Sequence, residues 1–122
     1  MEFFRIINTR TSETAIQNEI NTNSIPEINP DIIILDGNEE QFQIGSLWGE
    51  FTIRRDNIKG GIRFSMLDCP NALAWTITTG YPPEREKTIL HLTINRTQKP
   101  PEFIEEIEEF LESWVVGLEE RF

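Results

Sequence analysis

Apolar and polar residues alternate through the middle of the chain with the period of two expected for strands that bury one face. The alternation is clearest on two segments that flank a glycine-containing turn at 56–61. A hairpin centred on Ile58 and Lys59 would place Ile53 opposite Phe64, with both apolar sets on one face. Two more strands are predicted at 73–79 and 88–95. The apolar positions of the hairpin are Leu47, Phe51, Ile53, Ile62, Phe64 and Met66.

The pattern is weaker before this hairpin. Residues 2–7 are short and apolar, and they fit either a strand or the first turns of a helix. Hydroxyl residues precede a pair of isoleucines in 11–20, which predicts a short helix. The prolines and polar residues of 21–30 are typical of a loop. The β-branched run at 32–35 predicts a strand, which returns near 40–44 after a tight turn.

After Pro101 the hydrophobic period becomes that of a helix. Proline suits the start of a helix, because its missing N–H would have no partner there. We therefore predict a single α+β domain over residues 1–122, an antiparallel meander of about five or six strands with a long C-terminal helix across one face. The apolar stripe of this helix is Phe103, Ile107, Phe110, Leu111, Trp114 and Leu118.

Composition narrows the class of protein. Hydrophobic residues make up 38% of the 122 residues, enough for a core. A single cysteine, Cys69, and a single histidine, His91, can form neither an internal disulfide nor a closed zinc site, and no nucleotide-binding or metalloprotease motif is present. We expect neither a metal nor a cofactor. No apolar run approaches the ~20 residues of a membrane span, and the start lacks a signal peptide, which predicts a cytoplasmic protein without membrane association.

Charge is unevenly distributed along the chain. The formal net charge is -10, yet residues 51–100 carry eight bases and four acids. In the predicted register Arg54 lies opposite Arg63, and like charges across strands repel each other. This arrangement favours an anion or an acidic partner between them, unless acids of the chain itself neutralise them. Nucleic acid is not expected to bind such an acidic surface.

Trp48 would share the polar face of the hairpin with Arg54. An exposed tryptophan beside arginines is typical of a contact hot spot, although residues 1–35 could also cover the ring. Trp75 and Trp114 fall on apolar faces and are predicted to be core. The predicted partner or anion surface therefore consists of Trp48, Arg54, Arg55, Lys59 and Arg63.

Cys69 and His91 offer a second candidate chemistry. Cys69 falls in a predicted loop and His91 in the last predicted strand, so a cysteine–histidine dyad is one interpretation. In the other, Cys69 packs as a small hydrophobe and His91 is an ordinary strand residue.

The segments 47–51 and 69–75 resemble a group of short, uncharacterised cyanobacterial proteins. The resemblance covers about the C-terminal two thirds of the chain and implies no activity. In size, charge and order of elements the chain is also similar to the small acidic chaperones of type III secretion. That resemblance implies a homodimer that binds a protein partner and has no enzymatic activity.

Two hypotheses of function follow. The first is a non-enzymatic protein-interaction or regulatory module that acts through the basic hairpin. The second is a small-ligand-binding protein or small enzyme with a pocket between the sheet and the C-terminal helix, lined by Arg63, Cys69 and His91. An enclosed cavity with these side chains inside would favour the second, and a filled core with an uncovered polar sheet face the first.

Overall fold

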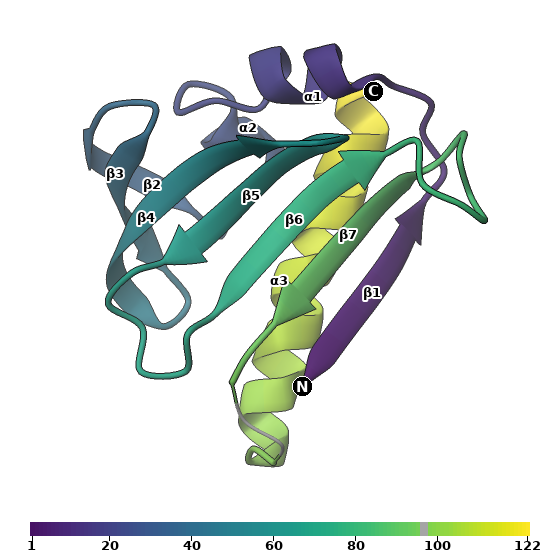
Figure 1. The fold of residues 1–122 in the computed structure, drawn as a ribbon. Coiled ribbons are helices and arrows are strands. Elements are labelled where there is room, and N and C mark those ends of the chain that lie inside the picture. The colour runs from purple at the N-terminus through teal and green to yellow at the C-terminus, as the bar shows by residue number, and fades with distance from the viewer. Residues whose placement is uncertain (96–97) are drawn as a thin grey trace.

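All the strands that the structure describes belong to one antiparallel sheet, with the order β1-β7-β6-β5-β4-β3-β2. The structure is a computed structural model that describes residues 1–95 and 98–122 (Figure 1). Strands β2 to β7 follow one another as a meander, and β1 joins beside β7 at the far edge. The elements are β1 (Glu2–Ile7), α1 (Glu13–Glu19), α2 (Ile25–Ile28), β2 (Ile33–Gly37), β3 (Gln41–Ser46), β4 (Gly49–Ile58), β5 (Gly61–Met66), β6 (Ala74–Thr79), β7 (Thr88–Thr93) and α3 (Pro101–Arg121).

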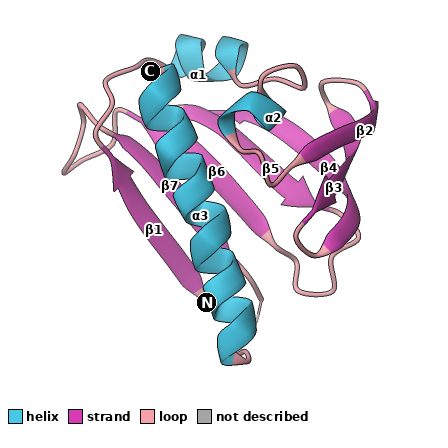
Figure 2. Ribbon diagram, turned by 180° about the vertical axis from the view of Figure 1, so that it is seen from behind, coloured by secondary structure: helices cyan, strands magenta, loops and turns pink. Residues whose placement is uncertain are grey.

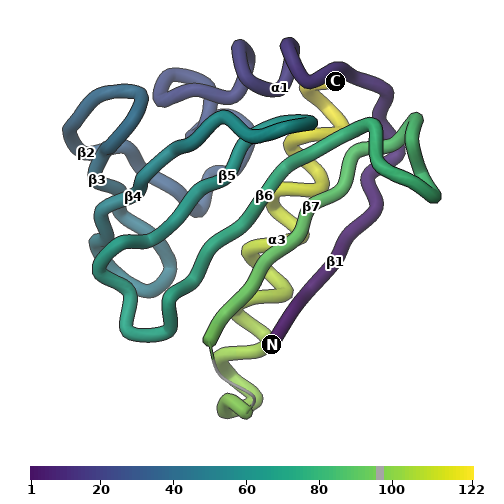
Figure 3. Tube along the Cα trace, viewed as in Figure 1, coloured from purple at the N-terminus to yellow at the C-terminus, as the bar shows by residue number. Residues whose placement is uncertain are grey.

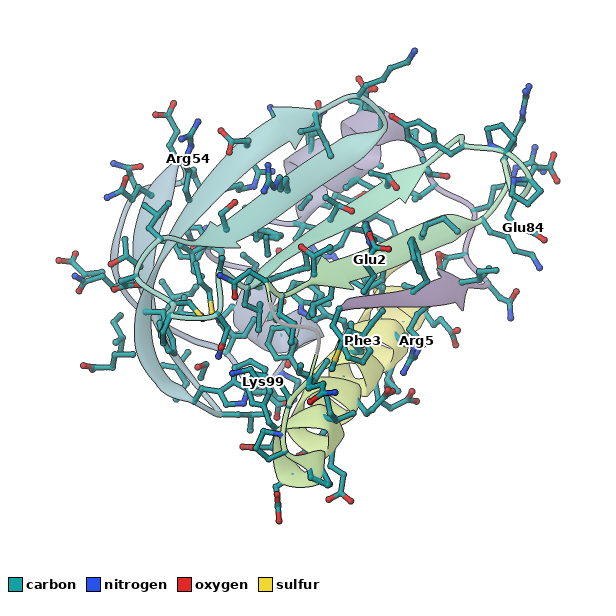
Figure 4. The ribbon with its side chains drawn as sticks, turned by 60° about the horizontal axis from the view of Figure 1, so that its bottom comes forward. Glu2, Phe3, Arg5, Arg54, Glu84 and Lys99 are labelled. Atoms are coloured by element: carbon teal, nitrogen blue, oxygen red, sulfur yellow. The ribbon has the colours of Figure 1, made fainter. Side chains whose placement is uncertain are left out.

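The prediction of a five- or six-stranded meander is therefore wrong: the described chain has seven strands, and the first is added out of sequence order. The sequence of β1 does not alternate regularly, because two apolar side chains point outward and one basic side chain points inward. Phe4 and Ile6 point to the exposed face, 55% and 53% exposed, whereas Arg5 lies on the helix side. Arg5 forms an ion pair with Glu108 of α3, which is what makes a basic residue tolerable on that side (Figure 4).

Helix α3 crosses one face of the sheet and closes the core, as the apolar stripe predicted (Figure 2). Five members of the stripe are completely buried, and Phe103, in the first turn, is half-buried. Pro101 occupies the start of the helix, where its missing N–H costs nothing. No helix of residues 1–95 and 98–122 lies on the opposite face of the sheet. The five buried members are Ile107, Phe110, Leu111, Trp114 and Leu118.

Helix α1 lies at the end of the sheet where α3 finishes (Figure 3), and α2 lies beside α3 (Figure 2). Helix α1 was predicted, and Ser12 caps it by accepting a hydrogen bond from the Ala15 N–H at 3.0 Å. Helix α2 was predicted as loop. It is a single turn whose Pro26 stands at the start, the one part of a helix where proline fits, so the sequence gives little sign of it.

The β4–β5 hairpin turns one residue later than predicted. Ile58 pairs with Gly61, so the turn consists of Lys59 and Gly60, and Gly60 takes a positive φ of 90° that glycine adopts without strain. The later turn changes the cross-strand partners of the arginines. Arg54 faces Ser65, and Arg63 faces Asp56. Arg54 and Arg63 are therefore not directly opposite each other as predicted, but lie at diagonal positions with Ser65 and Asp56 as their partners.

Candidate functional site

The space between the sheet and α3 is filled by aromatic rings. The rings of Trp75 and Trp114 lie 6.2 Å apart, centre to centre, and both lie near Phe64, at 5.2 and 6.1 Å. Phe110 extends the cluster, with its ring 5.2 Å from Trp75 and perpendicular to it. Edge-on and tilted contacts at these distances are the favourable geometries for aromatic pairs.

This interior holds no room for a water molecule. Its measurable cavity volume is ≈ 0 Å³, and the walls come from both the sheet and the helices. The enclosed pocket of the second hypothesis is thus not open in this structure. The residues around this space are Ile25, Ile32, Phe42, Ile44, Ile53, Phe64, Trp75 and Trp114.

The indole nitrogens of this cluster have no hydrogen-bond partners. The Nε1 atoms of Trp75, Trp114 and Trp48 are all buried, and none donates to an acceptor in the described part of the chain. Trp75 is 2% exposed and Trp114 is 0% exposed. A buried donor left without an acceptor costs about 1–3 kcal/mol, and such groups are uncommon in folded proteins. Three of the five buried side-chain nitrogen atoms that have no partner within the described residues are therefore indole nitrogens.

Trp48 is not on the polar face of the hairpin, where it was predicted. It lies in the two-residue turn between β3 and β4, because Ser46 pairs directly with Gly49. Gly49 has a positive φ of 108°, which lets the chain reverse at this point. The half-buried Trp48 ring reaches α3, 5.2 Å from Phe110 and 5.8 Å from Phe103. The ring therefore packs against α3.

The four bases of the hairpin do not form one surface with Trp48. Arg54 lies on the exposed face (Figure 4) and contacts Asp56 at 3.2 Å. Arg55, the next residue along β4, points to the helix side. Arg55 donates hydrogen bonds to the carbonyl of Gln17 and to Asn57 Oδ1. Burial lowers the pKa of the Arg55 guanidinium, and the Glu39 carboxylate opposes this shift. Lys59 stands at the tip of the turn, and Arg63 is exposed.

Arg63 and His91 lie on the same face of the sheet, the face away from α3, on the strands that flank β6. Both are register partners of Thr76, and they line a shallow hollow of ≈ 280 Å³. The His91 ring stacks on Phe4 at 4.1 Å, and its Nε2 lies 3.3 Å from Glu2 Oε1. Cys69 lies apart from both, half-buried in the β5–β6 loop against the core. The three predicted pocket residues therefore do not converge between the sheet and the helix.

We expect Cys69→Ser to cost about 1 kcal/mol of unfolding free energy, because it makes one half-buried apolar contact polar. Urea denaturation followed by circular dichroism measures this. Rapid reaction of Cys69 with a thiol reagent at neutral pH, as fast as an activated thiolate, would contradict its role as a packing residue.

The described residues contain neither a metal-binding cluster nor a membrane-spanning helix. Within residues 1–95 and 98–122, no group of three or more His, Cys, Asp or Glu side chains is placed to hold a metal ion. In the same ranges, no helix has the length and apolar character to cross a membrane.

Solved structures share the arrangement of sheet and helix. A START superfamily protein from Mycobacterium smegmatis matches with a TM-score of 0.62 and 17% identity, over 98% of this chain and 95% of that one. XoxI from Bacillus cereus matches with a TM-score of 0.63 and 16% identity, over 99% of this chain and 94% of its own. An uncharacterised protein from Bacillus thuringiensis matches with a TM-score of 0.59 and 14% identity, over 93% of this chain and 96% of its own. No protein-family model matches the sequence, and no curated protein does.

At these identities the similarity establishes the fold, which is a START-like helix-grip fold in which the sheet holds a long C-terminal helix. Both resemblances drawn from the sequence are corrected by this finding. The structural neighbours are START-like proteins and not type III secretion chaperones, and no match supports the cyanobacterial group. The chaperone resemblance rested on size, charge and element order, which unrelated α+β folds share.

Proposed function

We propose that this protein binds a small, mostly apolar ligand between the sheet and α3, and that the ligand offers a hydrogen-bond acceptor to the buried indoles. The observation that carries the proposal is the set of unpartnered Nε1 atoms of Trp48, Trp75 and Trp114. An acceptor oxygen of a bound ligand would recover the free energy that these donors lose on burial. The aromatic walls would supply the apolar contacts.

The fold supports this proposal over the interaction-module hypothesis. The structural neighbours include a START superfamily protein, and proteins of that superfamily are often ligand-binding. The polar contacts of a ligand in the core would differ from those predicted from the sequence. Arg63, Cys69 and His91 do not line this space, and the indoles of Trp75 and Trp114 are the polar groups among the residues that do.

Because the interior is filled, a ligand has to displace side chains that can move. Trp48 and Phe103 are the half-buried rings of the cluster, and they lie at the end of α3 where the helix begins. The Lys99 ammonium lies over the Phe103 ring, 5.3 Å from the ring centre. Moving these two rings outward would open the cluster toward Phe110 without unfolding the sheet. We assign the ligand entrance to this end.

A pair of probes that differ by one carbonyl oxygen tests the proposal. Nitrogen-15 NMR resolves the three indole N–H signals, and indane and 1-indanone are titrated separately. We expect 1-indanone to bind about fivefold more tightly than indane, which corresponds to about 1 kcal/mol for one net hydrogen bond. The ketone should also shift the signals of Trp75 and Trp114 downfield.

Trp48→Phe is the matched variant for the entrance. It keeps an aromatic ring at the turn and removes one indole N–H, so the remaining two signals should still respond to the ketone. Arg63→Gln on the outer face should leave both titrations unchanged. Equal binding of indane and 1-indanone would refute recognition through the indoles. The absence of any indole shift with either probe would refute ligand binding in the core.

A further inference from the structure

Most bases in the described part of the chain already have a partner. Arg55 donates its hydrogen bonds within the protein, and Lys99 lies over the Phe103 ring. Lys59, Arg63 and Arg85 have neither a carboxylate within 4.0 Å nor a ring contact within residues 1–95 and 98–122. Of these three, Lys59 and Arg85 line the same hollow. The bases in ion pairs are Arg5, Arg10, Arg54, Lys87 and Arg121.

The hollow lies next to the start of α1, which contributes Glu13 to its lining, and has a volume of ≈ 350 Å³. Three segments form it: the β1–α1 connection, the β4–β5 turn and the β6–β7 loop (Figure 1). Two hydrogen bonds of 2.7 Å join these segments. Glu13 Oε2 accepts from the Gly60 N–H, and the Tyr81 hydroxyl donates to the Lys59 carbonyl. The walls are thus held in place by the protein itself.

Hydrogen-bond donors outnumber acceptors among the side chains that line the hollow. Lys59 and Arg85 contribute an ammonium and a guanidinium group, and Thr11 and Ser12 contribute hydroxyls. Ser12 Oγ already accepts from the Ala15 N–H, so its own proton is available to another acceptor.

The charges around the hollow leave an excess of positive charge in an acidic protein. Glu13 is the single carboxylate in the lining, and it is engaged by the Gly60 N–H. The neighbouring charges of the β6–β7 loop are paired with each other or with Arg10. Arg10 contacts Glu86 at 3.1 Å, and Lys87 contacts Glu84 at 3.6 Å.

We infer that this hollow binds a phosphate group. A lysine, an arginine and two hydroxyls can donate to all the oxygens of a tetrahedral anion, whereas a carboxylate has only two oxygens to offer. Tyr81 is 41% exposed beside these donors, so its ring face is available to the organic part of a phosphate ester. The site is separate from the interior between the sheet and α3, and it does not depend on ligand binding there.

Titration with inorganic phosphate and with phenyl phosphate tests this site. Sodium chloride keeps the ionic strength constant, and backbone amide NMR signals report binding. We expect saturable shifts at Thr11, Ser12, Gly60 and Tyr81 in the millimolar range. Lys59→Gln and Arg85→Gln should each weaken binding about tenfold, because each removes a charge-assisted hydrogen bond. Tighter binding of phenyl phosphate would identify an ester as the ligand, and equal binding would identify the free anion.

Arg63→Gln is the matched control. The substitution removes the same charge as Lys59→Gln and Arg85→Gln. Arg63 also has no carboxylate partner within the described residues, but it lies on the outer face of the sheet, away from the hollow. This variant should leave the dissociation constant within about twofold of the parent. Equal weakening by all three variants would show only general attraction to positive charge and would overturn the proposal. Shifts that do not saturate, or that occur elsewhere, would also overturn it.

Discussion

Replacement of Trp114 by alanine is expected to lower the free energy of unfolding by about 3–5 kcal/mol, a large part of the stability of a domain of this size. The Trp114 side chain is completely buried, and it joins α3 to the sheet through Phe64 and Trp75. Its removal leaves a cavity that the strands cannot close without losing their pairing. Urea denaturation followed by far-ultraviolet circular dichroism measures the loss.

Two further variants make this result interpretable. Trp114→Phe keeps an aromatic ring and removes the unpartnered N–H, so it should cost clearly less than the alanine variant. Val116 lies on the exposed side of the same helix and is 49% exposed. Val116→Ala should therefore change the free energy of unfolding by no more than about 0.5 kcal/mol. An unchanged urea midpoint for Trp114→Ala would contradict the packing of α3 on the sheet.

Gly117→Ala is expected to destabilise the protein by about 3 kcal/mol, at the upper end of the cost of overpacking. A Cβ atom at Gly117 would lie 1.7 Å from the Ile28 carbonyl oxygen and 2.5 Å from its carbon. Helix α3 and helix α2 would have to move apart to admit it. In an ordinary exposed helix the same substitution stabilises by about 1 kcal/mol, so the sign of the effect is diagnostic.

The control for Gly117 is Gly45→Ala. A Cβ atom at Gly45 meets only the Ile33 side chain, at an ordinary contact distance of 3.8 Å. Its substitution should therefore change the free energy of unfolding by less than about 1 kcal/mol. A stabilised Gly117→Ala protein would mean that α3 does not approach α2 as closely as the structure places it.

The sequence predicted the elements whose pattern agrees with their burial. The stripe from Ile107 to Leu118 predicted α3, because each of its apolar members faces the core. The alternation at Ile62 and Phe64 likewise predicted β5. Strand β1 could not be assigned in the same way, because its outward residues are apolar and its inward Arg5 is compensated by Glu108, 103 positions along the chain.

The candidate sites were less predictable than the fold. The alternation of β4 was extended back to Trp48, but the chain turns there and the ring joins the core. A shift of one residue in the β4–β5 turn separated Arg54 from Arg63. The unpartnered indoles have no signature in the sequence, since the absence of an acceptor depends on every residue that packs around the ring.

The pairing of β1 with β7 also bears on how the protein folds. Thr9 and Thr88 contact each other although they are 79 positions apart, and the Met1 amino group donates to the Ile94 carbonyl 93 positions away. Closing loops of this length costs chain entropy before any contact is gained, and folds dominated by such distant contacts form slowly. During synthesis on the ribosome, β1 cannot pair until β7 has emerged. The hydrophobic face of the meander stays uncovered until α3 is synthesised, so we expect an incomplete chain to aggregate more readily than the full chain.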